Sequence, residues 1–235
     1  MKIAILSDIH GNFEALNEVL NDVDAQGITT LLVLGDLVGY YYQHKECFER
    51  LNSSKYQIHI IRGNHEDLFE QTIVDQKKAQ FYIDKYGHSL ELAKRDLNDS
   101  EKKWLFAAPK SLTLELEGRK ILLCHGAPWD TDQYVYPDSK EEVFSRFSGF
   151  EADFILMGHT HHKLDQVIDG VRLLNFGSVG QNRKVGGFAS FGIIDLVVND
   201  VIFKDIPYDV SRLVDSVLKM DKDLPYLKNV LLRKQ

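Results

Sequence analysis

Five short apolar segments in this sequence each end in a turn that is rich in aspartate, asparagine and histidine. The first segment is KIAIL at 2–6, and the last is FILM at 154–157. The turns that follow the five segments are SDIH (7–10), GD (35–36), GNHE (63–66), CHG (124–126) and GHTH (158–161). Short apolar runs bounded by turn residues are typical of buried strands, and open α/β sheets carry their sites at the carboxyl ends of strands. The pattern therefore predicts that these turns meet at one edge of a sheet.

The segments between these runs indicate helices in the first part of the chain and hairpins in the second. Apolar residues recur at helical spacing over 13–23. Further helices are predicted at 44–51, at 76–97, around Trp104 with Ser100 as cap, after a capping box at 139–142, and at 210–220. Hairpins are predicted to turn at 117–118, 169–170 and 199–200. This order predicts an α/β fold, a mixed β-sandwich flanked by helices. We expect a single domain over 1–235, with 207–235 as a C-terminal helical extension that ends in a polar tail.

The composition limits the classes of function. The chain has 235 residues and a net charge of −7, which argues against a protein that holds long nucleic acid by its phosphates. The two cysteines, Cys47 and Cys124, do not make a disulfide framework. No apolar stretch reaches the length of a membrane span, and the start does not resemble a signal peptide. We therefore expect a cytoplasmic protein with no membrane partner.

The five turns carry donors that suit metal ions. The candidate metal ligands are Asp8, His10, Asp36, Asn64, His125, His159 and His161. Any one of these turns could be an ordinary loop, but five of them at the ends of apolar strands favour a shared site. Carboxylate, amide and imidazole donors without thiolate suit Mn²⁺, Fe²⁺/Fe³⁺ or Zn²⁺. Seven ligands are too many for one tetrahedral ion and suit two ions with a bridging carboxylate, an arrangement that serves phosphoryl displacement.

These motifs resemble a known family. Asp8-x-His10, Gly35-Asp36, Gly63-Asn64-His65, His125 and Gly158-His159-x-His161 together resemble the full motif set of calcineurin-like metallophosphoesterases, over roughly residues 1–182. SDIHGNFEAL, GDLVGY and NFGSVGQNR are similar to the smaller bacterial and archaeal branch, which includes phosphodiesterases and relatives of diadenosine tetraphosphate hydrolases. The resemblance implies a four-layer sandwich and a metal-dependent phosphoric ester hydrolase.

The resemblance also implies a role for each motif residue. The first metal would be held by Asp8, His10, Asp36 and His161, and the second by Asp36, Asn64, His125 and His159, so that Asp36 bridges. A bridging hydroxide would be the nucleophile. His65 would be the general acid rather than a ligand, and His162 a bystander. The two ions would be Mn²⁺ and/or Fe²⁺/Fe³⁺, with Zn²⁺ also compatible. Asn12 and Arg183, which lie in family motifs, are candidates to bind substrate.

Two departures from the family pattern affect the interpretation. Glu66 follows Asn-His where aspartate is usual, so a longer side chain must reach whatever it orients. The run Gly39-Tyr40-Tyr41-Tyr42 replaces the usual Gly-Tyr-Gly-Pro and leaves substrate inference from that loop open. The aromatic residues that follow the motif strands are Tyr40, Tyr41, Tyr42, Trp129, Tyr134 and Tyr136. These rings either stack on a nucleobase or pack as part of the protein.

The favoured function is hydrolysis of a small phosphorylated substrate, a nucleotide or a dinucleoside polyphosphate, by a phosphodiesterase. The alternatives are a phosphomonoesterase and a metal-binding scaffold without turnover, although a scaffold would be expected to have lost ligands. A nuclease is disfavoured because the chain is acidic and has no appended DNA-binding part. A metallo-β-lactamase-like site would need aspartate where Lys163 stands. The sequence leaves the oligomeric state open.

Overall fold

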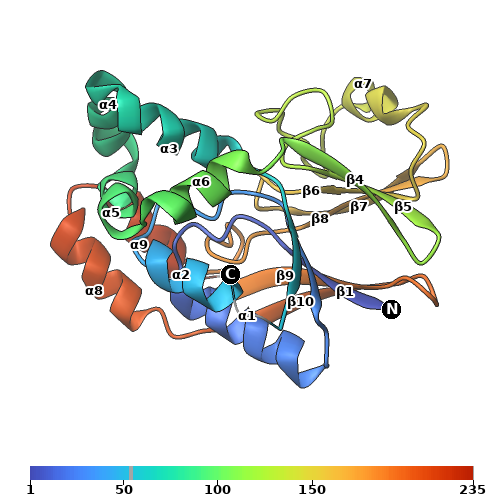
Figure 1. The fold of residues 1–235 in the computed structure, drawn as a ribbon, viewed down its shortest axis with the longest axis horizontal. Coiled ribbons are helices and arrows are strands. Elements are labelled where there is room, and N and C mark those ends of the chain that lie inside the picture. The colour runs from blue at the N-terminus through green and yellow to red at the C-terminus, as the bar shows by residue number, and fades with distance from the viewer. Residues whose placement is uncertain (53–54, 235) are drawn as a thin grey trace.

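A computed structural model describes residues 1–52 and 55–234 and shows two five-stranded sheets packed face to face (Figure 1). The first sheet has the order β10-β9-β1-β2-β3. Its strands are β1 (Lys2–Leu6), β2 (Thr30–Val33), β3 (Gln57–Ile60), β9 (Phe188–Asp195) and β10 (Asp200–Pro207). Strands β1, β2 and β3 run parallel, whereas β9 is antiparallel to both β1 and β10.

The second sheet has the order β4-β5-β6-β8-β7. Its strands are β4 (Ser111–Leu116), β5 (Arg119–Cys124), β6 (Phe154–Met157), β7 (Lys163–Ile168) and β8 (Val171–Phe176). Strands β5, β6 and β8 run parallel, and the hairpin partners β4 and β7 are antiparallel. Both sheets are therefore mixed, with three parallel strands each.

The central strands β1, β2 and β6 are apolar at nearly every position because both of their faces are buried. In β1, Ile3 and Ile5 face the second sheet, where they meet residues such as Leu123 of β5. Ala4 and Leu6 of the same strand face the helices that cover the first sheet. This alternation follows from the two-residue period of a strand, and it fixes the direction in which the residues after β1 leave the sheet.

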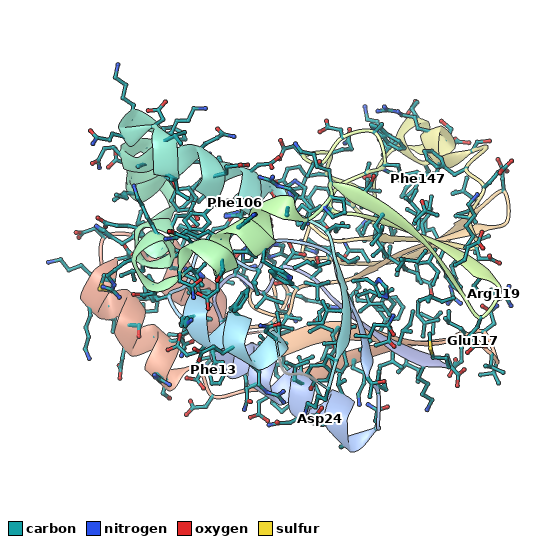
Figure 2. The ribbon with its side chains drawn as sticks, in the orientation of Figure 1. Phe13, Asp24, Phe106, Glu117, Arg119 and Phe147 are labelled. Atoms are coloured by element: carbon teal, nitrogen blue, oxygen red, sulfur yellow. The ribbon has the colours of Figure 1, made fainter. Side chains whose placement is uncertain are left out.

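Helices cover both outer faces of the sandwich. In Figure 1, α1 (Phe13–Ala25) and α2 (His44–Leu51) lie below the first sheet, and α7 (Glu141–Phe144) lies above the second. Four helices extend from the end of the sandwich, namely α3 (Asn64–Val74), α4 (Gln76–Tyr86), α5 (Ser89–Asp96) and α6 (Asp99–Ala107). Phe147, labelled in Figure 2, is fully buried and packs on Trp129. The predicted fold, a mixed β-sandwich flanked by helices in four layers, is confirmed.

The C-terminal part forms two helices, α8 (Ser211–Met220) and α9 (Pro225–Leu231). The sequence predicts only the first of these helices, followed by a polar tail. Leu227 and Leu231 of α9 are buried in one cluster with Tyr40 and Tyr41, so the tail is amphipathic. None of the helices in the described residues combines the length and apolarity needed to cross a bilayer.

Three other predicted helices differ in detail. The single helix expected over 76–97 is two helices, because the chain turns at Gly87 with φ 87°, a left-handed conformation that favours glycine. The helix around Trp104 is capped by Asn98, whose Oδ1 accepts the Glu101 N–H, and not by Ser100. The capping box at 139–142 does not form, since Lys140 occupies the N-cap position of the one-turn α7. The sequence does not predict helix α3, which begins at Asn64 shortly after β3 ends at Ile60, because its first turn carries the polar motif Asn64-His65-Glu66.

Candidate functional site

The polar turns after five strands meet at one edge of the sandwich. Asp8 and His10 follow β1, Asp36 follows β2, and Asn64 begins α3 just after β3. From the second sheet, His125 follows β5, and His159 and His161 follow β6. All five strands run in parallel groups, so their carboxyl ends lie at the same edges. The structure therefore brings together all seven predicted ligands.

The seven side chains form two groups with the geometry of cation sites. Asp8, His10 and His161 offer ligand atoms within 4.8 Å of one another, and Asp36, His125 and His159 do the same. Asp36 lies between the groups, because its Oδ2 is 3.1 Å from His125 Nε2 and 3.8 Å from His10 Nε2.

Asn64 belongs with the second group, where its Oδ1 is 3.1 Å from His125 Nε2. The two groups and the intermediate position of Asp36 match the division of ligands that the family resemblance implies.

Backbone carbonyls orient three of the histidine rings. His10 Nδ1 is 3.1 Å from the Val38 carbonyl oxygen, and His161 Nδ1 is 2.8 Å from that of Gln181. His125 Nδ1 is 2.7 Å from the Leu34 carbonyl oxygen. A carbonyl oxygen only accepts, so each Nδ1 carries the hydrogen, and each Nε2 faces the centre as a potential ligand. Metal-binding histidines are commonly held in this way.

Several contacts in the site fit bound cations better than hydrogen bonds. His10 Nε2 and His161 Nε2 are 3.1 Å apart, although each ring has its hydrogen on Nδ1 and so presents a lone pair to the other. Two nitrogens bound to one ion at about 2.1 Å, at a right angle, would be about 3.0 Å apart. His159 Nε2 is buried without a hydrogen-bond partner in the described residues. A cation in each of the two groups would satisfy these three nitrogens.

The charges of the groups respond to burial and to one another. Burial lowers the pKa of His159 to about 4, with a smaller effect from His125, so this ring is neutral at pH 7. Burial also acts to lower the pKa of His125, but the Asp36 carboxylate outweighs it and raises that pKa to about 10. His125 therefore holds a proton against Asp36 when no cation is bound, and metal binding would release that proton.

The candidate ligands lie on strained backbone. Asp8, His10, Asp36, His159 and His161 all have positive φ, between 53° and 67°. This left-handed region is uncommon for residues other than glycine and costs each of them on the order of 1 kcal/mol or more. Such strain persists only where the surrounding fold imposes it, and it clusters at functional sites.

Two glycines allow the close approach of these side chains. A Cβ atom at Gly63 would lie 2.2 Å from Asp36 Oδ1, and a Cβ atom at Gly39 would lie 2.2 Å from His65 Nδ1. Real Cβ atoms do not come so near to another heavy atom, so any larger residue would displace Asp36 or His65 from its position.

Glu66 holds the loop that carries Asp36. Its Oε2 accepts the N–H groups of Asp36 and Gly63, each at 2.8 Å, and its Oε1 accepts those of Leu37 at 2.8 Å and Val38 at 3.2 Å. Burial and the nearby Asp36 carboxylate raise the pKa of Glu66 to about 7, and the donated N–H groups oppose that rise. The extra methylene relative to aspartate thus serves to reach the backbone of 36–38, and Glu66 positions Asp36 rather than the His65 ring.

Replacing Glu66 with glutamine is expected to destabilise the protein. The amide NH₂ would face two of the four backbone N–H groups, and each buried donor left without an acceptor costs about 1–3 kcal/mol. The free energy of unfolding, measured by urea denaturation, should fall for Glu66→Gln and stay unchanged for Glu91→Gln, since Glu91 is exposed. Equal stabilities of the two variants would contradict this role of Glu66.

His65 lies beside both groups with its ring among aromatic residues. Its backbone N–H donates to Asp36 Oδ1 at 2.9 Å, and its ring centroid is 4.8 Å from those of His10 and Tyr40. The Tyr82 hydroxyl lies 3.2 Å from His65 Nδ1 and accepts the Tyr40 N–H, so its own hydrogen is free to point at Nδ1. His65 Nε2 would then carry the ring hydrogen. Burial lowers the pKa of this imidazole below its ordinary value.

Tyr82 was not identified from the sequence. It lies within α4 and follows no motif strand, so only the packing of α4 against the site reveals it. His65 also forms a third group of potential ligands with His10 and Asp36. The arrangement alone thus allows either a ligand or an acid at this position.

The two candidate substrate residues differ in their surroundings. Asn12 is fully buried and caps α1: its Oδ1 accepts the Ala15 N–H, and its Nδ2 donates to the Gly180 carbonyl and the Tyr208 hydroxyl. Its amide hydrogens are therefore both used inside the protein. The Arg183 guanidinium, in contrast, makes no hydrogen bond or ion pair with the described residues, which leaves it available to an anion.

The aromatic residues separate into packing residues and site residues. Trp129 packs on Phe147, and the Arg146 guanidinium lies 4.0 Å from its ring centroid. Tyr41 is fully buried and Tyr42 donates to Asp221, so both bind the C-terminal helices to the site loop.

The other three rings lie at the site. Tyr40 packs edge-on against His10, with ring centroids 4.6 Å apart. Tyr134 lies 4.1 Å from His159 between ring centroids, is 44% exposed, and stacks on Tyr136. Tyr134 thus presents a free ring face or edge beside the second group of ligands.

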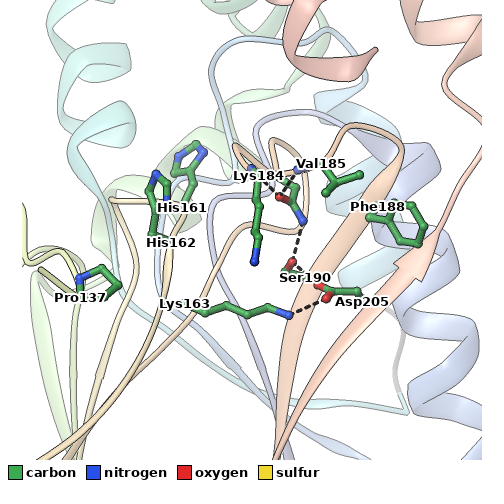
Figure 3. Close-up of a pocket in the computed structure, with 10 residues that line it drawn as sticks. Pro137, His161, His162, Lys163, Lys184, Val185, Phe188, Ser190 and Asp205 are labelled. Carbon is green, nitrogen blue, oxygen red and sulfur yellow. Dashed lines mark hydrogen bonds and ion pairs between the residues drawn. The ribbon is translucent and has the colours of Figure 1, made fainter. Parts of the chain in front are cut away.

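A cavity of about 520 Å³ adjoins the metal groups at His161 (Figure 3). It is lined by Pro137, His161, His162, Lys163, Asn182, Lys184, Val185, Phe188, Ser190 and Asp205. Lys163 is paired with Asp205 at 2.6 Å, and Asp205 also accepts from Ser190. The cavity therefore combines cationic and apolar walls, and His162, expected to be a bystander, forms part of one wall.

Comparison with known proteins agrees with this geometry. The model of the calcineurin-like phosphoesterase superfamily domain matches residues 1–198. The chain is 31% identical over 237 residues to the uncharacterized protein MJ0912 of Methanocaldococcus jannaschii, with 92% of each chain covered. It is 26% identical over 210 residues to phosphodiesterase YfcE of Escherichia coli K12, which covers 86% of this chain and 90% of that protein.

Solved structures show the same fold. A hypothetical protein PH1004 from Pyrococcus horikoshii superposes with a TM-score of 0.82 at 22% identity, covering 99% of this chain and 98% of that one. A metallophosphoesterase from Sphaerobacter thermophilus gives a TM-score of 0.77 at 24% identity, with 99% and 100% covered. The superposition extends beyond residue 198, so it includes the C-terminal helices.

Proposed function

Since the chain belongs to the calcineurin-like phosphoesterase superfamily, we propose that it is a two-metal phosphodiesterase that acts on a small nucleotide or a dinucleoside polyphosphate. The observation that carries the two-metal part is the pair of buried ligand groups with Asp36 between them. The similarity to a protein named phosphodiesterase YfcE supports the diester part.

In this proposal, the first ion is held by Asp8, His10, Asp36 and His161, and the second by Asp36, Asn64, His125 and His159. Carboxylate, amide and neutral imidazole donors suit Mn²⁺ and Fe²⁺/Fe³⁺, and Zn²⁺ is also compatible. Bound ions would polarise the phosphoryl oxygens. They would also lower the pKa of a bound water molecule, so that hydroxide forms near neutral pH. The strained turns and the carbonyl-bound histidines hold the ligands ready, so binding requires little rearrangement of the chain.

His65 supplies the proton to the leaving oxygen in this proposal. The proton would come from the imidazolium form of the ring. In that form Nδ1–H donates to the Tyr82 hydroxyl and Nε2–H points away from it, while Asp36 Oδ1 accepts the His65 backbone N–H. A positioned acid of this kind contributes roughly 10²–10⁴ to the rate. The Arg183 guanidinium would bind a phosphoryl oxygen, and Asn12 supports the loop at Gly180.

The organic part of the substrate would occupy the cavity beside His161 or lie against Tyr134, which packs on His159 and is not one of the residues that line this cavity. Lys184 offers positive charge there, whereas Lys163 is already paired with Asp205, and Pro137 and Phe188 offer apolar surface. A base could stack on Tyr134, because aromatic stacking tolerates any base. Binding energy gained away from the reacting phosphorus can be used in the transition state, so a substrate with these parts should be favoured over a bare aryl phosphate.

A substrate comparison tests the proposal. With Mn²⁺ added, kcat/KM should be higher for bis(4-nitrophenyl) phosphate and diadenosine tetraphosphate than for 4-nitrophenyl phosphate. A clear preference for the monoester would show a phosphomonoesterase instead. Absence of hydrolysis with every substrate, in protein that binds two ions per chain, would support a scaffold without turnover.

A further inference from the structure

A second cavity lies on the other side of the 181–185 loop, between this loop and α9. It measures about 410 Å³ and is lined by Gln181, Arg183, Tyr226, Asn229, Val230 and Arg233. Lys184 and Asn182 of the same loop line the cavity beside His161, so the loop separates the two spaces. The cavity exists only because α9 packs back onto the site.

Two positive charges in this cavity lack a carboxylate. In the described part of the chain, the arginines at positions 50, 62, 95, 119, 172 and 212 each form an ion pair, and Arg146 lies over the Trp129 ring. Arg183 and Arg233 do neither, and both line this cavity. Two guanidinium groups that line one cavity, without an ion pair to the described residues, favour an anion there, and phosphate matches their planar donors.

Two neutral polar groups at the same cavity also lack a partner. The Tyr226 hydroxyl is buried and makes no hydrogen bond with the described residues, and the same holds for Gln181 Nε2. Gln181 is 1% exposed, and its side chain lies beside the Tyr41 hydroxyl, whose own hydrogen is donated to the Leu227 carbonyl. Buried donors without acceptors are costly, and an anion in the cavity would accept from both.

The cavity walls are fixed by contacts between α9 and the loop. Arg233 donates from its guanidinium to the Arg183 carbonyl, and its own carbonyl accepts the Gly186 N–H at 2.8 Å. The Tyr41 hydroxyl donates to the Leu227 carbonyl at 3.2 Å. The space is thus part of the folded structure rather than a gap between independent segments.

The Tyr40 ring lies between the cavity and the two groups of candidate metal ligands. The Tyr226 ring centroid is 6.1 Å from that of Tyr40, and Tyr40 is 4.6 Å from His10. On the loop side, the Gln181 carbonyl accepts from His161 Nδ1. The cavity and the ligand groups are therefore neighbours across the Tyr40 ring and the 181–185 loop, and a chain of phosphates that reached both would pass beside Arg183 of that loop.

We propose that this cavity, the α9 cavity, binds a second phosphate group of the substrate. Arg183 would contact the chain of phosphates on its way from the metal groups, and Arg233, Tyr226 and Gln181 would hold the distal one. The proposal rests on the proposed phosphodiesterase function and narrows its substrate to nucleotides that carry two or more phosphates. Single-phosphate diesters would leave the cavity without its ligand.

The test compares two substrates in the Arg233→Gln variant of the full Mn²⁺-loaded protein. The ratio of kcat/KM for diadenosine tetraphosphate to that for bis(4-nitrophenyl) phosphate should fall roughly tenfold or more, as expected for loss of a charged hydrogen bond. Arg212→Gln removes the same charge from exposed α8 and should keep the wild-type ratio. An unchanged ratio in folded Arg233→Gln would overturn the proposal.

A binding measurement separates this inference from the proposed function. Calorimetric titration of inorganic tripolyphosphate and of orthophosphate into the Mn²⁺-loaded proteins needs no turnover. We expect Arg233→Gln to weaken tripolyphosphate selectively, and this result would support the cavity even if no diester were hydrolysed. Equal weakening of orthophosphate, without competition against bis(4-nitrophenyl) phosphate, would indicate a site for free phosphate and would overturn the assignment to substrate.

Discussion

Replacing Asp36 with asparagine is expected to remove nearly all activity and to reduce the metal content of the protein below two ions per chain. Asp36 Oδ2 lies near a histidine nitrogen of each ligand group, 3.8 Å from His10 Nε2 and 3.1 Å from His125 Nε2, and asparagine keeps the shape of this side chain while removing the charge. Two-metal sites supply several kcal/mol of stabilisation to the transition state, and each 1.36 kcal/mol is a factor of ten in rate. The loss in kcat/KM should therefore be roughly 10³-fold or more.

Metal analysis and turnover on the same preparation check this expectation. Asp84→Asn is a matched control, because Asp84 is exposed on α4 and should keep both ions and full activity. Wild-type protein should also gain thermal stability when Mn²⁺ is added, and the Asp36 variant should gain less. Two tightly bound ions in Asp36→Asn, together with near-normal turnover, would show that this residue does not bridge.

Replacing His65 with alanine is expected to slow turnover by roughly 10²–10⁴ while both ions remain bound. This combination distinguishes an acid from a ligand, since His65 is also placed to complete a group with His10 and Asp36. A second readout is how the loss of activity depends on the leaving group of the substrate. A nitrophenolate needs little protonation, so the variant should lose less activity on bis(4-nitrophenyl) phosphate than on an ester with a nucleoside alcohol as leaving group.

Tyr82→Phe is the companion variant for His65. It removes the hydroxyl at His65 Nδ1 without emptying the space that the ring fills, so it should produce a smaller loss with the same leaving-group dependence. If His65→Ala loses an ion, His65 is a ligand and the acid must be another group. If both variants retain wild-type rates, the leaving oxygen receives its proton from solvent.

The sequence predicted the sandwich and the meeting of the motif turns because both follow from local patterns. A run of apolar residues predicts a buried strand such as β1, and a parallel arrangement of β1 and β2 then places Asp8 and Asp36 at one edge of the sheet. The seven candidate ligands were identified in this way. The same local reasoning could not find α3, whose first turn carries the polar motif Asn64-His65-Glu66, or the break at Gly87 between α4 and α5.

Long-range packing explains what remained hidden. The sequence does not distinguish the three consecutive tyrosines at 40–42. In the structure, Tyr40 packs on His10, whereas Tyr41 and Tyr42 bond to the C-terminal helices. The roles of Tyr82 and Arg233 likewise depend on contacts with residues far away in the chain. No motif marks such residues, because their neighbours in space are not their neighbours in sequence.

Each ligand group draws its members from both sheets. Asp8 and His10 come from the first sheet and His161 from the second, whereas Asp36 comes from the first and His125 from the second. An ion in either group would be bound by residues of both sheets and would therefore link the two sheets of the sandwich. Loss of metal would then loosen the sheets at this edge first, where amide exchange would report the opening, while the far ends of the strands stay closed on their apolar core.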